Sequence, residues 1–81
     1  MHYRNGREAK NGDRVIQLDY GSSKIVAAGV LAEATPGNDY CNGYVLNGLS
    51  RSGACLCDAL HIDDVEAALA EKGWDKRPAG K

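Results

Sequence analysis

The segment that decides the fold reads GDRVIQL at residues 12–18, GSSK at residues 21–24 and GVL at residues 29–31. It predicts a strand, a turn opened by glycine and a second strand. Gly29 falls inside the second strand, before its apolar end, and a glycine in a strand often marks a bulge or a tight bend. We therefore expect a small, strongly curled sheet, a barrel.

The length and composition limit the kinds of structure that the chain can form. Its 81 residues form one domain, and they include no phenylalanine, one tryptophan and four tyrosines. A domain this small buries only about 60% of the surface that its unfolded chain exposes, so the core is thin and a deep substrate cleft is not expected. No run approaches the roughly 18 apolar residues of a membrane span, and the first residues lack the apolar core of a signal peptide. We expect a soluble, cytoplasmic protein.

The net charge of −1 conceals a segregation of charge along the chain. Residues 1–14 carry four basic and two acidic residues, residues 58–71 carry five acidic and no basic residues, and residues 72–81 carry four basic residues and one acidic residue. Binding to nucleic acid depends on neutralising phosphates and normally needs a clear basic excess. The overall composition does not supply that excess, although a local basic patch could.

The order of turn and apolar segments predicts a mainly β domain with one helix. Asn5-Gly6 indicates a hairpin with a type I′ turn near residues 3–9, and a second turn follows at residues 10–13. Asp63 is expected to cap a helix that stops at Gly73. The predicted strands cover residues 14–20, 24–34, 40–49 and 54–62, the helix covers residues 63–72, and residues 74–81 form a flexible basic tail after a domain of residues 1–73.

The glycine-opened strand pair resembles the KOW-type signature of small SH3-like barrels. That signature has Gly-Asp before a strand, a Gly-x-x-Lys turn and a second glycine followed by an apolar residue; here these are Gly12-Asp13, Gly21-Ser22-Ser23-Lys24 and Gly29-Val30. The resemblance covers about residues 3–35. It implies an SH3-like curved barrel of four or five antiparallel strands, here with one C-terminal α-helix, that binds RNA or protein without catalysis.

The first fifteen residues also resemble the opening of small uncharacterised bacteriophage and prophage proteins. The similarity lies in Tyr3, Asn5-Gly6, Ala9-Lys10, Gly12-Asp13 and Val15. It implies an accessory protein of a phage or prophage.

Tyrosines and basic residues at strand ends form the predicted binding rim, because aromatic rings stack on bases and cations meet phosphates. These residues are Tyr3, Arg4, Arg7, Arg14, Tyr20, Lys24 and Tyr44. The leading hypothesis is a non-catalytic module that contacts a protein or a nucleic acid. One alternative is a small homo-oligomer that holds an anionic small molecule, such as a nucleotide, between subunits. Another is a zinc-stabilised structural domain.

Three cysteines and a histidine are the candidate metal ligands: Cys41, Cys55, Cys57 and His61. Structural zinc sites present ligands two to four residues apart at a tight turn, whereas Cys55 and Cys57 are one residue apart on a predicted strand. We expect buried free thiols, with a disulfide from Cys41 to one of that pair as an alternative, and no metal or other cofactor. His61 beside Cys57 lacks an orienting third residue, so we predict no enzyme.

Overall fold

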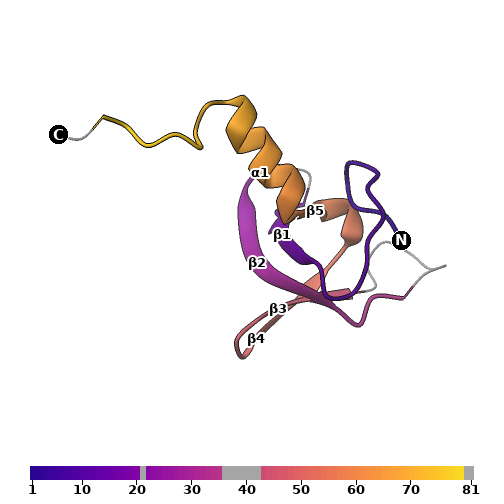
Figure 1. The fold of residues 1–81 in the computed structure, drawn as a ribbon. Helices are drawn as coiled ribbons and strands as arrows, with labels where there is room; N and C mark the ends of the chain where they lie inside the picture. The colour runs from indigo at the N-terminus through magenta and orange to yellow at the C-terminus, as the bar shows by residue number, and fades with distance from the viewer. Residues whose placement is uncertain (21, 36–42, 80–81) are drawn as a thin grey trace.

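The computed structural model describes residues 1–20, 22–35 and 43–79, and these form one five-stranded antiparallel sheet with a C-terminal helix (Figure 1). The prediction of a mainly β domain with one helix is confirmed. The strand order in the sheet is β4-β3-β2-β1-β5. The elements are β1 (Arg14–Leu18), β2 (Ile25–Ala32), β3 (Gly43–Asn47), β4 (Ser50–Ala54), a 3-10 turn η1 (Leu56–Asp58), β5 (Ala59–His61) and α1 (Ile62–Glu71).

The segment after β3 differs from the prediction of one strand over residues 54–62. The chain turns at Gly48, whose φ is +61°, and the polar stretch at 50–54 then pairs with β3 as an edge strand. The 3-10 turn follows and buries Leu56 to 2% exposure. The alternation of apolar residues could not predict the edge strand β4 or the 3-10 turn, because β4 is mostly polar and the 3-10 turn interrupts the predicted strand. Cys55 and Cys57 consequently do not share a regular strand.

The N-terminal hairpin forms, but with a different turn. His2 bridges Glu8, the Tyr3 amide donates to Arg7 O at 2.8 Å, and the Gly6 amide donates to Tyr3 O at 3.0 Å. Gly6 has a φ of +88°, whereas Asn5 does not have a positive φ. A type I′ turn needs positive φ at both positions, so the prediction of that turn is wrong. The three-residue loop with glycine in the left-handed region is the other common way to close a hairpin.

Helix α1 begins one residue earlier than predicted and uses a different cap. His61 has an extended backbone, and its Nδ1 accepts the Asp63 amide at 3.0 Å, so His61 and not Asp63 is the N-cap. The helix ends as predicted: Gly73 has a φ of +75° and donates to Ala70 O, and the Trp74 amide donates to Leu69 O. This pair of bonds is the Schellman motif, in which glycine takes the left-handed position after the helix.

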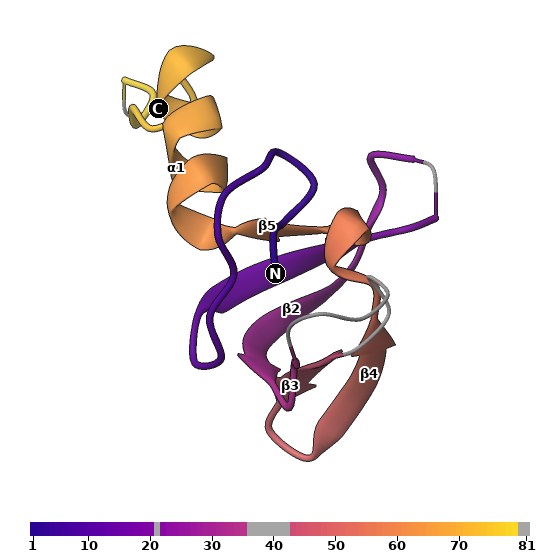
Figure 2. The same ribbon diagram turned by 90° about the vertical axis from the view of Figure 1, so that its right-hand side faces the viewer.

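The hydrophobic core lies on the inner face of the curled sheet. Leu31 and Ala59 are fully buried there, and the N-terminal hairpin covers this face with Tyr3. The view in Figure 2 shows the N-terminal segment crossing in front of β1 and β2, with α1 standing to one side of the sheet. The complete core cluster comprises Tyr3, Ala9, Val15, Leu31, Ala34, Val45, Ala54, Leu56 and Ala59.

Two residues show how far the sheet curls. Gln17 in β1 donates through Nε2 to Gly53 O in β4 at 3.0 Å, and its Oε1 accepts from the Ser52 hydroxyl at 2.8 Å. Strands β1 and β4 are not neighbours in the sheet, so these bonds require the sheet to fold back on itself. Gly29 permits the close approach of β2 and β3, since a Cβ there would overlap the backbone carbonyl of Leu46. The predicted bend at Gly29 is therefore a close backbone contact, while the irregular register lies between Gln17 and Leu18.

Gly29→Ala should lower the free energy of unfolding by about 1–3 kcal/mol, because the new methyl group forces β2 and β3 apart. Chemical denaturation of the purified variant measures the change. Gly53→Ala is the matched control: it also lies in a strand, and the nearest atom to a Cβ there, Tyr44 Cε1, is 3.9 Å away. Equal stability of the two variants would contradict the close approach.

Candidate functional site

Arg4, the first cation of the predicted binding rim, is engaged inside the fold. Its guanidinium donates to Cys57 O at 2.9 Å, to Ser22 O at 3.1 Å and to the Asp58 carboxylate at 2.9 Å. Its amide also donates to Ala59 O at 3.1 Å. Arg4 thereby joins the N-terminal segment, the β1–β2 turn and the 3-10 turn, and its donors are directed at protein oxygens instead of at a ligand.

Tyr3, the first aromatic residue of the rim, lies in the core and is 3% exposed. Its hydroxyl donates to Asp13 Oδ2 at 2.7 Å. Burial raises the pKa of Tyr3 far above its usual value, and the hydrogen bond to the Asp13 carboxylate adds to this effect. A tyrosine held in this way cannot stack on a base.

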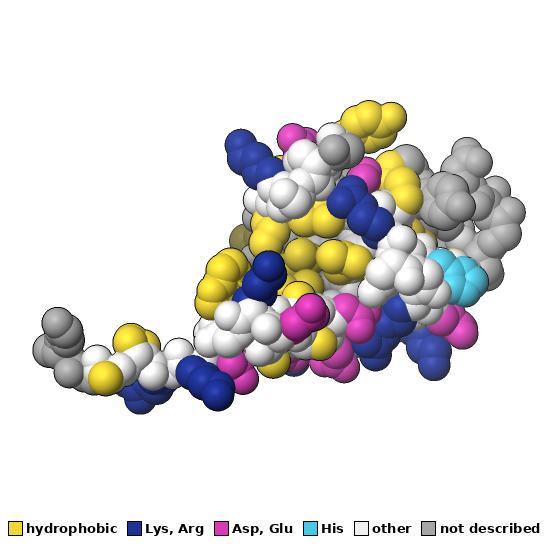
Figure 3. Space-filling view, turned by 90° about the horizontal axis from the view of Figure 1, so that it is seen from above, with side chains coloured by type: hydrophobic (Ala, Val, Ile, Leu, Met, Phe, Trp, Pro, Cys, Tyr) yellow, Lys and Arg dark blue, Asp and Glu magenta, His cyan; other side chains and the backbone are white. Residues whose placement is uncertain are grey.

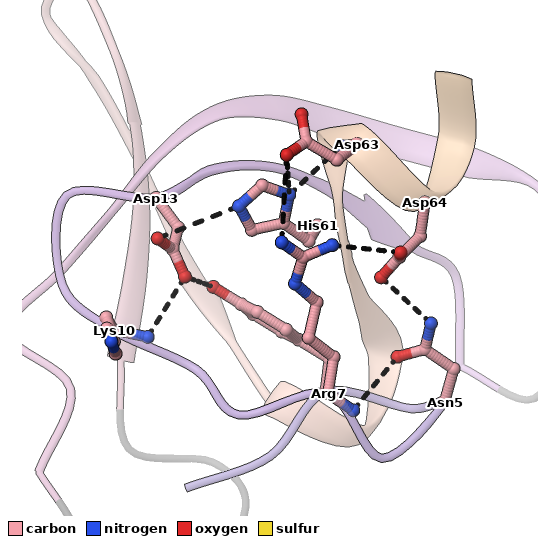
Figure 4. A network of polar contacts seen from close by, with 8 residues as sticks. Asn5, Arg7, Lys10, Asp13, His61, Asp63 and Asp64 are labelled. Atoms are coloured by element: carbon pink, nitrogen blue, oxygen red, sulfur yellow. Dashed lines mark hydrogen bonds and ion pairs between the residues drawn. The ribbon is translucent and has the colours of Figure 1, made fainter. Parts of the chain in front are cut away.

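Asp13 is the centre of the polar network drawn in Figure 4. Partial burial acts to raise the pKa of Asp13, but the hydrogen bonds from Tyr3 and from the Lys10 amide, with the electrostatic contributions of His61 and Arg7, outweigh it and hold the pKa below its usual value. His61 Nε2 lies 3.7 Å from Asp13 Oδ1. The turn at 10–13 is thus tied both to the core and to the start of α1.

Arg7 joins the N-terminal hairpin to the first turn of the helix. Its guanidinium lies 2.9 Å from Asp64 Oδ1 and 3.6 Å from Asp63 Oδ2. The Asn5 side chain donates to the other oxygen of Asp64 at 3.0 Å, and this bond, followed by the contact with Arg7, lowers the pKa of Asp64. These acids also lie at the helix N-terminus, where negative charge is favourable. The whole set (Tyr3, Asn5, Arg7, Lys10, Asp13, His61, Asp63 and Asp64) is called the polar network below.

A hollow of about 290 Å³ opens beside this network and is lined by Arg7, Glu8, Lys10, Asp13 and His61. The Asp13 carboxylate at this hollow accepts a hydrogen bond from Tyr3, and Arg7 is paired with Asp64 of the helix. Arg7, Asp13 and His61 are therefore engaged in structural contacts among the hairpin, the turn at 10–13 and the helix.

The polar network should make the fold sensitive to acid. The folded state holds Asp13 and Asp64 ionised at pKa values below the 3.8 of the unfolded chain, so their contribution is complete well above pH 3.8 and is lost as the pH falls through 3.8 toward the folded values. We expect the urea midpoint to fall as the pH drops below about 4. Asp13→Asn should be less stable at neutral pH and lose less on acidification. A wild-type midpoint that is unchanged at about pH 3 would contradict this account.

The remaining rim residues do not gather around Tyr3 and Arg7, although Arg4 donates to Ser22 O in the turn between Tyr20 and Lys24. Tyr20, 90% exposed, and Lys24 lie at the β1–β2 turn. Tyr44 lies in β3 with the Arg51 guanidinium stacked 4.0 Å from its ring centre, and Arg51 is also paired with Glu33. The seven predicted residues therefore do not form one rim.

Arg14 lies on the outer face of the sheet, opposite Val30 in the β1–β2 pairing. Its side chain is exposed and makes no hydrogen bond or ion pair with any described residue. It is the predicted basic residue best placed to meet an external group beside an apolar surface.

That apolar surface is the outer face of β2 and β3, which the sequence analysis missed. Val26 is 50% exposed and Val30 is 39% exposed, and paired residues of neighbouring strands project to the same side of a sheet. We define the open face as Val26, Ala28, Val30, Tyr44 and Leu46. The available signal was the absence of alternation in IVAAGVLA at 25–32, because a strand that is apolar on both sides is normally covered on both sides.

The open face is hollowed where it meets the helix. A second hollow of about 290 Å³ is lined by Ala28, Val30, Asn47 and Ile62, with Arg14 at its side. The space-filling view in Figure 3 shows hydrophobic side chains gathered in a depression beside the helix, with charged side chains around it. Ile16 and Leu18 on the same side of β1 are 7% and 6% exposed, so the helix covers one part of the outer face and leaves the other part open.

Each edge strand of the sheet, β4 and β5, already accepts a hydrogen bond from another part of the chain. Gly53 O of β4 accepts from Gln17, and Ala59 O of β5 accepts from the Arg4 amide. An added strand would have to displace these bonds. A partner has easier access to the open face than to an edge.

The cysteines differ from the expectation of free thiols. Cys57 is a free, half-buried thiol, whereas Cys55 is disulfide-bonded, so the prediction is wrong for Cys55. Cys41 lies outside the described residues. Within residues 1–20, 22–35 and 43–79 no group of three His, Cys, Asp or Glu side chains is arranged to hold a metal ion. His61, the fourth candidate ligand, is the helix cap in the polar network.

Comparison of the chain with protein-family models, curated proteins and solved structures gave no match. Among the described residues, no helix combines the length and apolar character that crossing a membrane requires.

Proposed function

We propose that this protein is a non-catalytic binding module whose partner is a protein that docks on the open face. The observation that carries the proposal is the composition of β2, whose inner face forms the core and whose outer face presents Val26, Ala28 and Val30 to solvent. Contiguous exposed apolar surface on a small domain is typical of a site of protein association. Arg14 and the stacked pair of Arg51 and Tyr44 give this surface the aromatic and arginine residues that interfaces favour.

The distribution of charge favours a protein over a nucleic acid. Arg4 and Arg7 are paired with Asp58, Asp63 and Asp64, so their charges are balanced within the fold. The chain as a whole has a net charge of −1. Affinity for nucleic acid depends on cations that are free to replace the counterions of phosphate, and an apolar face contributes nothing to that exchange.

The proposal includes an SH3-like barrel as the scaffold of this module. The KOW-like glycines supply the resemblance, and the bonds from Gln17 to β4 supply a physical reason for strong curvature. The proposal also includes an accessory role in a bacteriophage or prophage. This part rests on the resemblance of the first fifteen residues to the opening of small bacteriophage and prophage proteins.

A double-mutant cycle on Gln17 and Ser52 tests whether side chains hold β1 against β4. Ser52→Ala should lower the free energy of unfolding by about 0.5–1.5 kcal/mol, as expected for one lost hydrogen bond, and Gln17→Ala should lower it by about 1–3 kcal/mol, because it also removes the bond to Gly53 O. The double variant should cost clearly less than the two single changes added together, because they remove the same bond. Strict additivity in urea denaturation would argue against a shared contact and against closure of the barrel at this position.

Val30→Glu tests the open face as a binding site. Because Val30 is 39% exposed, this change should alter the stability by no more than about 0.5 kcal/mol while it places a charge in an apolar contact. Immobilised wild-type protein should retain partner proteins from cells that express it, and Val30→Glu should reduce that retention at least about tenfold. Leu49→Glu is the matched control, since Leu49 is fully exposed at the turn between β3 and β4, away from the helix (Figure 1).

A second arm of this experiment addresses nucleic acid directly. We titrate the wild-type protein and Val30→Glu with single-stranded RNA at low salt. We expect that the substitution does not change the binding of RNA. Two results together would overturn the proposal in favour of a phosphate-binding surface. The first is RNA binding that falls steeply with salt and is kept in Val30→Glu, and the second is protein retention that does not depend on Val30.

A further inference from the structure

Helix α1 is capped by a side chain that can change its charge. Most helix N-caps are Ser, Thr, Asp or Asn, whereas here His61 Nδ1 accepts the Asp63 amide at 3.0 Å. An imidazole nitrogen accepts a hydrogen bond only when it carries no proton. The cap therefore exists only while the ring of His61 is neutral, with its proton on Nε2.

A second set of partners for the His61 ring is already in place. Nε2 lies 3.7 Å from Asp13 Oδ1, and Nδ1 lies 3.8 Å from Asp63 Oδ2 (Figure 4). Asp13 Oδ2 accepts from the Tyr3 hydroxyl and from the Lys10 amide, which leaves Oδ1 facing the imidazole. An imidazolium at this position would thus have a carboxylate oxygen close to each of its two nitrogens.

The charged groups around the ring include more acids than bases. The hairpin contributes Arg7 and Glu8, the turn contributes Lys10 and Asp13, and the helix contributes Asp63 and Asp64. Strand β1 places Val15 opposite His61 and adds no charge through this pair. The ring of Tyr3 meets the imidazole edge-on, with ring centres 6.2 Å apart. These surroundings can accept a positive charge on the ring.

The first turn of α1 depends on this cap. The helix has ten residues, none of them is fully buried, and it packs against β5 and β1. A helix of this length is marginal in water without such support. Among the described residues, His61 is the one side chain that accepts from an amide of the first helical turn. Protonation of the ring would leave the Asp63 amide without its acceptor.

Ile62 connects the cap to the open face. It follows His61 directly, is the first residue of α1, and lines the hollow that also contains Ala28 and Val30. His61 itself lines the other hollow, on the side of the hairpin. A change at the cap therefore takes place one residue away from the wall of the surface on which we propose that a partner docks.

We propose that His61 is a pH-sensitive switch at the start of α1. Histidine is the side chain whose charge ordinarily changes between about pH 5 and 8. The neutral ring holds the Asp63 amide and keeps Ile62 in the wall of the hollow. On mild acidification a proton from solvent binds Nδ1, the bond from the Asp63 amide breaks, and the imidazolium pairs with the carboxylates of Asp13 and Asp63.

Release of the cap loosens the first turn of α1, so the open face loses part of its wall and binds its partner less well. This consequence rests on the proposed function and adds regulation by pH to it. Protonation of a histidine that biases a two-state element is a common form of such regulation.

The test is nuclear magnetic resonance of the full chain between about pH 8 and 5. Asp13 and Asp64 stay ionised there, because their pKa values lie below 3.8. At about pH 8 the His61 ring should be the Nε2–H tautomer. As it takes up a proton, the Asp63 amide should exchange about five- to tenfold faster relative to an unstructured chain at the same pH, as expected for a lost cap. The methyl signals of Ile62 should follow the same titration curve.

His61→Asn provides a cap that does not titrate, since asparagine is a preferred N-cap. Its Asp63 amide and Ile62 signals should stay constant over this range of pH. His2→Asn is the matched control: it removes the other histidine of the chain, which bridges Glu8 in the hairpin, and it should behave like the wild-type protein. A wild-type Asp63 amide whose protection does not change, or a His61→Asn variant that changes as the wild type does, would overturn the switch.

Retention of partner proteins separates this inference from the proposed function. Immobilised wild-type protein should retain less partner at about pH 5.5 than at about pH 8, whereas His61→Asn should retain the same amount at both. Equal retention by the wild type at both values, while the Asp63 amide titrates, would refute the link to the open face and leave the proposed function intact. Retention that never depends on Val30 would refute the proposed function, and the Asp63 and Ile62 signals would still decide the switch.

Discussion

The structure depends on a strand that is apolar on both of its faces. β2 is in the middle of the sheet, and its inner residues, Leu31 above all, form the centre of the core. Its outer residues need cover as well, because exposed valines on a central strand leave apolar area in water. One helix of ten residues covers the part of this face over β1 and leaves the part over β2 and β3 open. The surface on which we base a function is thus a consequence of how one strand is buried.

The charged residues illustrate how tertiary contacts reassign side chains. In the sequence, Arg4 and Arg7 belong to a basic N-terminal segment, and the acids at 58–64 belong to an acidic segment. In the fold these segments meet: Arg4 pairs with Asp58, and Arg7 pairs with Asp63 and Asp64. Partly exposed pairs of this kind contribute little stability individually. They connect the N-terminal hairpin to the 3-10 turn and to the helix. Arg14 takes part in none of these pairs and lies beside the apolar surface.

His61 connects these two parts of the molecule. It caps α1 through Nδ1 and faces Asp13 through Nε2, so the start of the helix is attached to the turn that precedes β1. The helix follows β5 directly in the chain and packs against β5 and β1.

The sequence by itself determined the features that depend on local backbone chemistry. Gly12, the turn at 10–13, the two long strands that follow and the end of the helix at Gly73 were all readable, because turns and caps have residue requirements that neighbouring positions satisfy. The predicted bend at Gly29 was also meaningful, although its cause is the backbone of β3 and not a bulge. The uniform apolar character of β2 indicated cover on both sides, and this was the one sequence signal of the candidate site.

Only the tertiary structure decided which side chains are free to act. The polar edge strand β4 and the 3-10 turn before β5 have no periodic signal, since their conformation follows from pairing with β3 and from burial of Leu56. The engagement of Tyr3 with Asp13 and of Arg7 with Asp64 joins residues 10 and 57 positions apart. Composition shows that such side chains exist, but contact across the fold determines whether they bind one another or remain available to a partner.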